Sequence, residues 1–261
     1  MGLFDFFRNR RRRKRFAEPF PDEWREIVAR NFEMFHRLSP EDQTELLHHM
    51  NVFLGEKTFE GCGGLEMTDE IRVTIAAQAC MLLLHHEEPH YYPDLYTILV
   101  YPHAYVARAK EVLPGGIVIE GASARLGESW VRGCVVLSWD DVRSGAADAA
   151  DGHNVVLHEF AHQLDQEDGS SDGAPILEHR THYVAWARVL GDEFEKLRRA
   201  TERGRRTDID AYGATNAAEF FAVVTEAFFE RPRSLHKKHP ELYDELKTFY
   251  RQDPLGFVDP R

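Results

Sequence analysis

The segment VVLHEFAHQLD, residues 155–165, places two histidines four residues apart within an apolar run. On an α-helix, residues i and i+4 lie on the same face, so His158 and His162 would direct both imidazoles towards one point. Imidazole nitrogen is a common zinc ligand, and this His-Glu-x-x-His spacing leaves Glu159 beside the metal, where a general base would stand. Burying three polar groups on an otherwise apolar helix is unfavourable unless something engages them. The segment therefore predicts a metal-binding helix, and the alternative is a pair of ordinary surface histidines.

A catalytic zinc site needs a third protein ligand, and three downstream acids are candidates. Asp168 lies six residues after His162, but that arrangement requires a glycine where Asp165 stands. Glu219 and Glu226 both fall on a later predicted helix, and spacing alone does not separate them. Glu219 could instead be an acid that stabilises the first turn of its helix. Asp165, one turn after His162, could orient an imidazole or simply make a local cap or ion pair.

The other histidines do not repeat this geometry. His86 and His90 are four residues apart in the run HHEEPH, but Pro89 lies between them and interrupts the helical spacing. His179 and His182 are three apart on a helix that we expect to be largely solvated. The sequence therefore predicts one zinc ion per chain, held at the first pair.

The order of patterns along the chain predicts a mainly helical α+β fold rather than a doubly wound sheet. Apolar residues recur with helical period in the first and last thirds, whereas the middle holds short β-branched and aromatic runs punctuated by glycine and proline. Helices are expected within residues 21–38, 39–57, 68–86, 144–165, 178–200, 215–230 and 232–252, and strands within 96–102, 116–121, 128–133 and 134–139. We expect a helical N-terminal region, residues 17–95, to form one compact unit with a catalytic region, residues 96–261.

The charge is unevenly distributed. Residues 1–15, MGLFDFFRNRRRRKR, carry seven basic residues and one acid, so the formal net charge of −12 leaves −18 for the rest of the chain. We predict that residues 1–16 form a basic, disordered tail. The alternative is contact with an anionic membrane surface, with Phe4, Phe6 and Phe7 as the apolar part. Direct binding of nucleic acid is not expected, because the acidic body would repel phosphate.

Composition and cysteine usage indicate a soluble protein of the cytoplasm. Hydrophobic residues make up 43% of the chain and charged residues 29%, which is typical of a globular domain. Cys62, Cys80 and Cys134 are widely spaced, odd in number and outside any Cys-x-x-Cys pair. This pattern favours a reducing compartment and excludes both a disulfide framework and a cysteine zinc site.

Three longer segments carry a resemblance to a known family. They are HEFAHQLDQEDG, IDAYGATNAAEFFAVVTEAFFE and ELYDELKTFYRQDPLGF. Together they resemble the Mlc titration factor A family of bacterial zinc metallopeptidases, and the likeness extends from about Pro19 to the carboxyl terminus. The stretch YGATNAAEFFAVVTEAF is also similar to the catalytic domain of anthrax lethal factor. The resemblance implies a zincin-like metallopeptidase in which the helix of residues 155–165 carries the active site.

Matched position by position, the resemblance implies His158, His162 and Glu219 as zinc ligands, Glu159 as the base and Tyr212 as a tyrosine facing the metal. The implied reaction is hydrolysis of a peptide substrate, aminopeptidase-like, by a zinc-activated water. The strand of residues 134–139 would then lie along the cleft and pair with extended substrate. The family is also named for sequestering a glucose-uptake repressor, Mlc. The alternative function is therefore a binding protein for such a transcriptional repressor, in which zinc is mainly structural.

Overall fold

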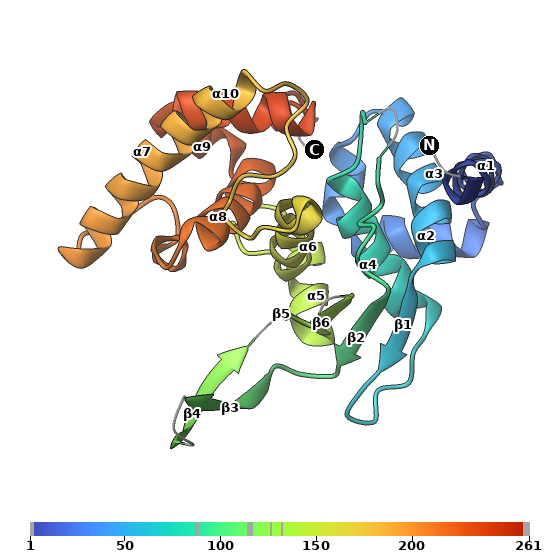
Figure 1. Cartoon of the computed structure of the whole chain (residues 1–261). Helices are drawn as coiled ribbons and strands as arrows, with labels where there is room; N and C mark the ends of the chain where they lie inside the picture. Colours follow the sequence, from blue (N-terminus) through green and yellow to red (C-terminus); the bar gives the residue numbers. More distant parts are fainter. Residues whose placement is uncertain (1–2, 87–88, 114–116, 126, 132, 258–261) are drawn as a thin grey trace.

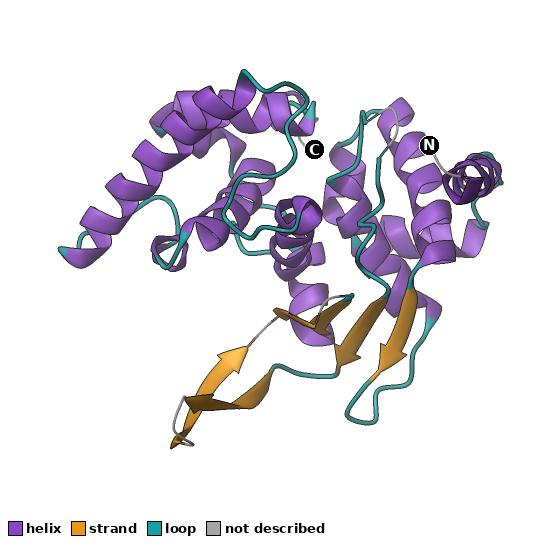
Figure 2. Cartoon of the chain, in the orientation of Figure 1, coloured by secondary structure: helices purple, strands orange, loops and turns teal. Residues whose placement is uncertain are grey.

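The computed structural model describes residues 3–86, 89–113, 117–125, 127–131 and 133–257, and helices dominate these ranges (Figure 2). A small sheet lies against them, which confirms the predicted mainly helical α+β fold class. The helices of the first part of the chain are α1 (Leu3–Phe16), α2 (Asp22–Asn31), the 3-10 turn η1 (Glu33–Arg37), α3 (Pro40–Glu56) and α4 (Asp69–Met81).

Helices α3 and α4 begin at the capping residues that the sequence places there. The Ser39 hydroxyl accepts a hydrogen bond from the Asp42 N–H at 3.0 Å, and Pro40 occupies the first helical position. The Thr68 hydroxyl accepts from the Ile71 N–H at 3.4 Å at the start of α4. From Val73 to Met81 every residue of α4 is buried, and all but Thr74 and Gln78 are apolar, as expected of a central core helix.

The sheet has the strand order β1-β2-β6-β5. Its strands are β1 (Thr58–Gly61), β2 (Thr97–Tyr101), β5 (Gly127–Val131) and β6 (Cys134–Ser138). Strands β1, β2 and β6 run parallel, and β5 runs antiparallel to β6. The prediction that the strand of residues 134–139 lies along the cleft and pairs with extended substrate was wrong, because β6 is paired on both sides, and β5 takes the sheet edge beside the helix of residues 155–165.

Two further strands form a hairpin that projects from the sheet. Strands β3 (Tyr105–Leu113) and β4 (Ile117–Arg125) pair with each other in antiparallel register and extend away from the helical body (Figure 1). The sequence predicted β4 but not β3 or the short β1.

The last part of the chain is helical again. Its elements are α5 (Trp139–Ala147), α6 (Val155–Asp165), η2 (Gln166–Asp168), α7 (His182–Glu202), η3 (Ala211–Ala214), α8 (Ala217–Glu230), α9 (Pro232–Lys238), α10 (Pro240–Tyr250) and η4 (Pro254–Gly256). The single helix predicted for residues 232–252 is two helices. Pro240 lacks the N–H needed to continue α9, so it starts α10 instead.

Buried side chains from the early and late helices belong to one continuous core. Phe160 of α6 is fully buried, and its ring lies 4.8 Å from that of Tyr92 and 5.6 Å from that of Phe53 in α3. Edge-to-face contacts of this kind stabilise a pair by roughly 0.5–1.5 kcal/mol beyond the area they bury. Through Phe160, the helix that carries His158 and His162 therefore packs against α3 and the segment after α4.

The structure corrects the prediction of disorder for residues 1–16, because α1 is a helix packed on α3. The Arg12 guanidinium donates to both carboxylate oxygens of Glu56 at 2.8 Å, and both side chains are largely buried. The Phe16 ring lies 5.1 Å from the ring of His49. The basic composition of residues 1–16 predicted a disordered tail, but the bidentate ion pair and the aromatic contact hold this segment as a helix against α3.

The membrane-anchor alternative for this segment rests on residues that the structure describes only in part. Phe7 is 57% exposed, whereas the side chains of Phe4 and Phe6 lie outside the described residues. Within the described ranges, no helix combines the length and apolar character needed to cross a membrane.

Candidate metal centre

Helix α6 starts at Asn154, which is fully buried. Its side-chain oxygen accepts hydrogen bonds from the N–H groups of Val156 and Leu157 at 3.1 and 3.0 Å. Its amide nitrogen donates to the Gly145 carbonyl in α5 at 3.1 Å. Because all polar atoms of the cap are engaged, the first turn of α6 is held firmly before the two histidines follow one turn apart.

Helix α8 lies beside α6 and supplies the acids (Figure 1). The Asn216 side chain accepts from the Glu219 N–H at 2.9 Å, which places Glu219 in the first turn. Further along, the Thr225 hydroxyl shares a buried hydrogen bond of 2.7 Å with the Tyr250 hydroxyl of α10. The cap defines the first turn of α8, and the bond between Thr225 and Tyr250 ties the middle of the helix to α10.

Three donor atoms from α6 and α8 meet in what we call the donor triangle. It consists of Nε2 of His158, Nε2 of His162 and Oε2 of Glu219, and its sides measure 3.0, 3.2 and 3.3 Å. Ligand atoms of a tetrahedral zinc ion at about 2.0–2.1 Å lie about 3.3–3.4 Å apart. Two imidazole nitrogens and a carboxylate oxygen are also the donor set of catalytic zinc sites. The triangle therefore fits a metal ion in both spacing and chemistry.

Glu226, the rival candidate for the third ligand, lies outside the donor triangle and orients His158 instead. Its Oε1 is 2.7 Å from Nδ1 of His158, and its Oε2 accepts from the Asn154 N–H at 2.6 Å. An ionised carboxylate can only accept, so Nδ1 carries the hydrogen and Nε2 keeps its lone pair for a metal. Sequence reasoning missed this role, although the seven-residue spacing between Glu219 and Glu226 places both on one face of α8.

His158 and Glu219 shift each other's pKa in opposite directions. Burial acts to lower the pKa of His158, but its hydrogen bonds with Glu219 and Glu226 prevail and raise that pKa to about 10. Burial acts to raise the pKa of Glu219, whereas its contacts with His158 and His162 hold that pKa far below its usual value. A proton on His158 therefore offsets part of the negative charge of the carboxylates beside it, and a metal ion that binds Nε2 has to displace that proton.

The remaining predicted residues divide into two groups. Glu159 is 4% exposed and follows His158 on α6, while the Tyr212 ring lies 6.0 Å from the His158 ring. The Tyr212 backbone is fixed, because its N–H donates to the Asp210 carboxylate at 2.7 Å. Asp168, by contrast, is exposed and accepts from the Ser170 N–H at 2.8 Å, so it takes no part in the donor triangle.

Asp165 is fully buried at the C-terminal end of α6. Burial raises its pKa to about 6. Among the described residues no hydrogen bond joins its carboxylate to His162, so the geometry gives no support to the idea that it orients that imidazole.

A second group of potential ligands lies apart from α6. Oδ1 of Asp42 is 2.7 Å from Nε2 of His85, and Glu45 accepts from the His85 N–H at 2.7 Å. Nδ1 of His85 contacts the Arg251 carbonyl at 2.8 Å. Burial acts to lower the pKa of His85, but the Asp42 hydrogen bond raises it above its usual value. These contacts describe an ion pair that ties α3 to the chain after α10.

Fold and site together define a class of protein. A mainly helical α+β body holds two histidines of a His-Glu-x-x-His helix and a glutamate of a neighbouring helix around one point, which is the arrangement of a metallopeptidase. The sequence pattern of the family described as glucose-regulated metallo-peptidase M90 matches residues 6–251. The chain belongs to this family of metallopeptidases.

Individual relatives agree with this assignment. The chain is 42% identical to an uncharacterised protein of Synechocystis sp. over 247 residues, covering 94% of this chain and 89% of that protein. It is 31% identical over 241 residues to a protein of Yersinia enterocolitica named Mlc titration factor A, covering 90% and 86% of the two chains. The protein of that name from Escherichia fergusonii is 30% identical over 235 residues, covering 89% and 86%.

Proposed function

We propose that this protein is a zinc-dependent peptidase that hydrolyses peptide bonds with a water molecule as nucleophile. The observation that carries the proposal is the donor triangle of His158, His162 and Glu219, whose sides of 3.0–3.3 Å suit zinc. These three side chains would hold the ion, and Glu226 would keep His158 in the correct tautomer. When bound, zinc supplies Lewis-acid chemistry, because it lowers the pKa of water and polarises a carbonyl group.

Glu159 is the proposed general base. It follows His158 on the same helix, its side chain is buried, and it is not one of the three donors of the triangle. The Glu159 carboxylate takes a proton from the attacking water and passes that proton to the leaving amine as the peptide bond breaks.

Tyr212 is the proposed donor to the developing oxyanion. The turn η3 presents its ring on the side of His158, and more than half of the Tyr212 side chain is open to solvent and hence to substrate. A hydroxyl that donates to negative charge formed only in the transition state lowers the barrier more than it strengthens substrate binding.

The substrate class is extended peptide with a free amino terminus. Strand β5 has a partner on one side among the described strands, and it lies next to α6. Its open edge can pair with a peptide backbone and lead the scissile bond past Glu159. We propose aminopeptidase-like cleavage of short peptides in the cytoplasm, a location supported by three free cysteines.

The test is hydrolysis of a panel of amino-acid and short-peptide chromogenic substrates, each with a free or a blocked amino terminus, by wild type and Glu159→Gln. We expect turnover of the unblocked substrates by wild type and a loss of at least about 10²-fold in Glu159→Gln. Equal activity of the two proteins would refute the role of Glu159. Cleavage of only the blocked substrates would refute the aminopeptidase assignment, but it would still support a peptidase function.

A second candidate function is sequestration of a transcriptional repressor of glucose uptake, with zinc mainly structural. The names of the Yersinia and Escherichia relatives favour it. Titration of an Mlc-like repressor into wild type and, for comparison, into Glu159→Gln separates the two candidate functions. Repressor binding by wild type and Glu159→Gln alike, without peptide hydrolysis by either, would establish the binding function in place of the peptidase.

A further inference from the structure

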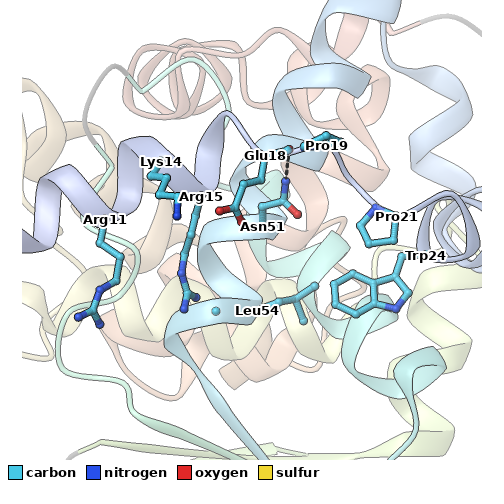
Figure 3. A pocket seen from close by; sticks show the side chains of 10 residues that line it. Arg11, Lys14, Arg15, Glu18, Pro19, Pro21, Trp24, Asn51 and Leu54 are labelled. Atoms are coloured by element: carbon cyan, nitrogen blue, oxygen red, sulfur yellow. Dashed lines mark hydrogen bonds between the residues drawn. The ribbon is translucent and has the colours of Figure 1, made fainter.

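A solvent-open hollow of about 550 Å³ lies between α1 and the body (Figure 3). None of its lining residues belongs to the donor triangle. Cations line one part of it, and prolines, a tryptophan and a leucine line the other. The lining residues are Arg11, Lys14, Arg15, Glu18, Pro19, Pro21, Trp24, Asn51, Leu54 and Gly55. Its volume is in the range of pockets that hold small molecules, about 300–1,000 Å³.

The cations of the hollow share one face of α1. Arg11, Lys14 and Arg15 have the spacing i, i+3, i+4, so their side chains lie together, and Figure 3 shows them extending from the same side of the helix. Among the described residues none of the three forms an ion pair, whereas neighbouring Arg12 binds Glu56 through two hydrogen bonds of 2.8 Å. Like charges at this spacing repel each other, so an anion in the hollow would relieve an existing strain.

Gly55 makes room for Arg15. Gly55 lies within the last turn of α3, where alanine would favour the helix by about 1 kcal/mol. A Cβ atom at this position would overlap the Arg15 guanidinium. The glycine therefore allows the guanidinium to rest directly on the backbone of α3, which fixes its place in the wall of the hollow.

The opposite wall is apolar and rigid. The Trp24 indole N–H donates to Asp69 at 2.9 Å, and the Arg72 guanidinium lies 5.6 Å from the centre of the Trp24 ring. The Asn51 side chain donates to the Glu18 carbonyl at 2.7 Å, which ties the end of α1 to α3 (Figure 3). An aromatic wall next to a group of cations suits a ligand with an anionic head and an apolar body.

We propose that this hollow binds a phosphate group. Two guanidinium forks and one ammonium match the geometry and the double charge of a phosphate better than the single charge of a carboxylate. Of the lining residues only Glu18 is acidic, so the hollow carries a local net charge of +2 in a chain whose net charge is −12. The phosphate can belong to a free small molecule or to a lipid headgroup, and the site is separate from the proposed peptidase centre.

The test is titration calorimetry of the full-length protein with pyrophosphate as the probe, in phosphate-free buffer. We expect saturable binding that Arg11→Gln and Lys14→Gln each weaken about tenfold, the loss of one charge-assisted contact. Arg10→Gln is the matched control, because it removes the same charge from the same helix outside the hollow. Screening limits its effect to about twofold. Gly55→Ala should also weaken binding about tenfold without lowering the melting temperature.

A second arm distinguishes the source of the phosphate. The same variants are sedimented with vesicles of phosphatidylcholine, with or without phosphatidylglycerol. Binding of phosphatidylglycerol vesicles but not of pyrophosphate, with the same dependence on Arg11 and Lys14, would support the proposal and assign a lipid headgroup. Binding of pyrophosphate alone would support it and assign a free ligand. Failure to bind either probe, or an equal loss in Arg10→Gln, would overturn the proposal.

Discussion

Replacing Glu226 by glutamine tests how the protein orients His158, one of the proposed metal ligands. The Glu226 carboxylate has two partners, Nδ1 of His158 at 2.7 Å and the N–H of Asn154 at 2.6 Å, and both are donors. A glutamine side chain offers one oxygen and one NH2 group. It can therefore satisfy only one of these donors and must direct its NH2 group at the other.

Either arrangement of the glutamine harms the site. If its oxygen faces Asn154, its NH2 group faces His158 and favours the tautomer with hydrogen on Nε2, the nitrogen of the donor triangle. If its oxygen faces His158, the buried Asn154 N–H at the start of α6 loses its partner. Loss of a carboxylate that orients a metal-bound histidine typically weakens metal affinity about 10–100-fold, which is about 1.4–2.8 kcal/mol.

The assay is competition for zinc between the protein and a chromophoric chelator at constant pH, for wild type, Glu226→Gln and Glu230→Gln. Glu230→Gln is the matched control, because Glu230 lies one turn further along α8 and accepts from the Gly152 N–H at 3.0 Å but touches no proposed ligand. We expect weaker zinc binding in Glu226→Gln alone. Wild-type zinc affinity in Glu226→Gln, or an equal loss in the control, would refute the orienting role.

Three further outcomes are expected. Tyr212→Phe should lower kcat about 10²–10³-fold with KM and zinc content little changed, and an unchanged kcat would remove Tyr212 from the mechanism. Zinc binding to the metal-free protein at pH 8 should release a proton from His158, whose pKa is raised to about 10, and calorimetry in buffers of different ionisation enthalpy would detect it. Burial raises the pKa of Glu230 from 4.5 to about 9, so the folded state holds a proton that the unfolded chain has lost. Stability should therefore fall as pH rises from about 5 to 9, by at most about 1.4 kcal/mol per pH unit, and urea unfolding should show a flatter profile for Glu230→Gln.

The sequence was informative wherever a local pattern decides the structure. His158 and His162 are brought together by the geometry of a single helix, so their pairing was predictable from their spacing. The caps Ser39 and Asn216 were predictable for the same reason, because a cap acts within one turn.

The choice between Glu219 and Glu226 was not available from spacing. They are seven residues apart, two turns of α8, and both face α6. What separates them is which nitrogen of His158 each one reaches, Nε2 for Glu219 and Nδ1 for Glu226. That distinction depends on the offset between two helices far apart in sequence, which only the packed fold defines.

Two of the errors of the sequence analysis have the same origin. Residues 1–16 were predicted to be disordered from their charge, but Glu56, 44 residues after Arg12, provides the partner that orders α1. The strand of residues 134–139 was predicted to pair with extended substrate, but β5 folds back and pairs with β6 on that side. Both outcomes depend on contacts between residues far apart in sequence, and composition and periodicity do not predict such contacts.

The most direct test of the account is the zinc content of three proteins after dialysis against a weak chelator, measured by elemental mass spectrometry. The proteins are wild type, Glu219→Gln and Asp168→Asn, the last being the rejected candidate ligand. The account predicts one zinc per chain in wild type and Asp168→Asn, and far less than one in Glu219→Gln. Full zinc content in Glu219→Gln, or its loss in Asp168→Asn, would contradict the proposed ligand set.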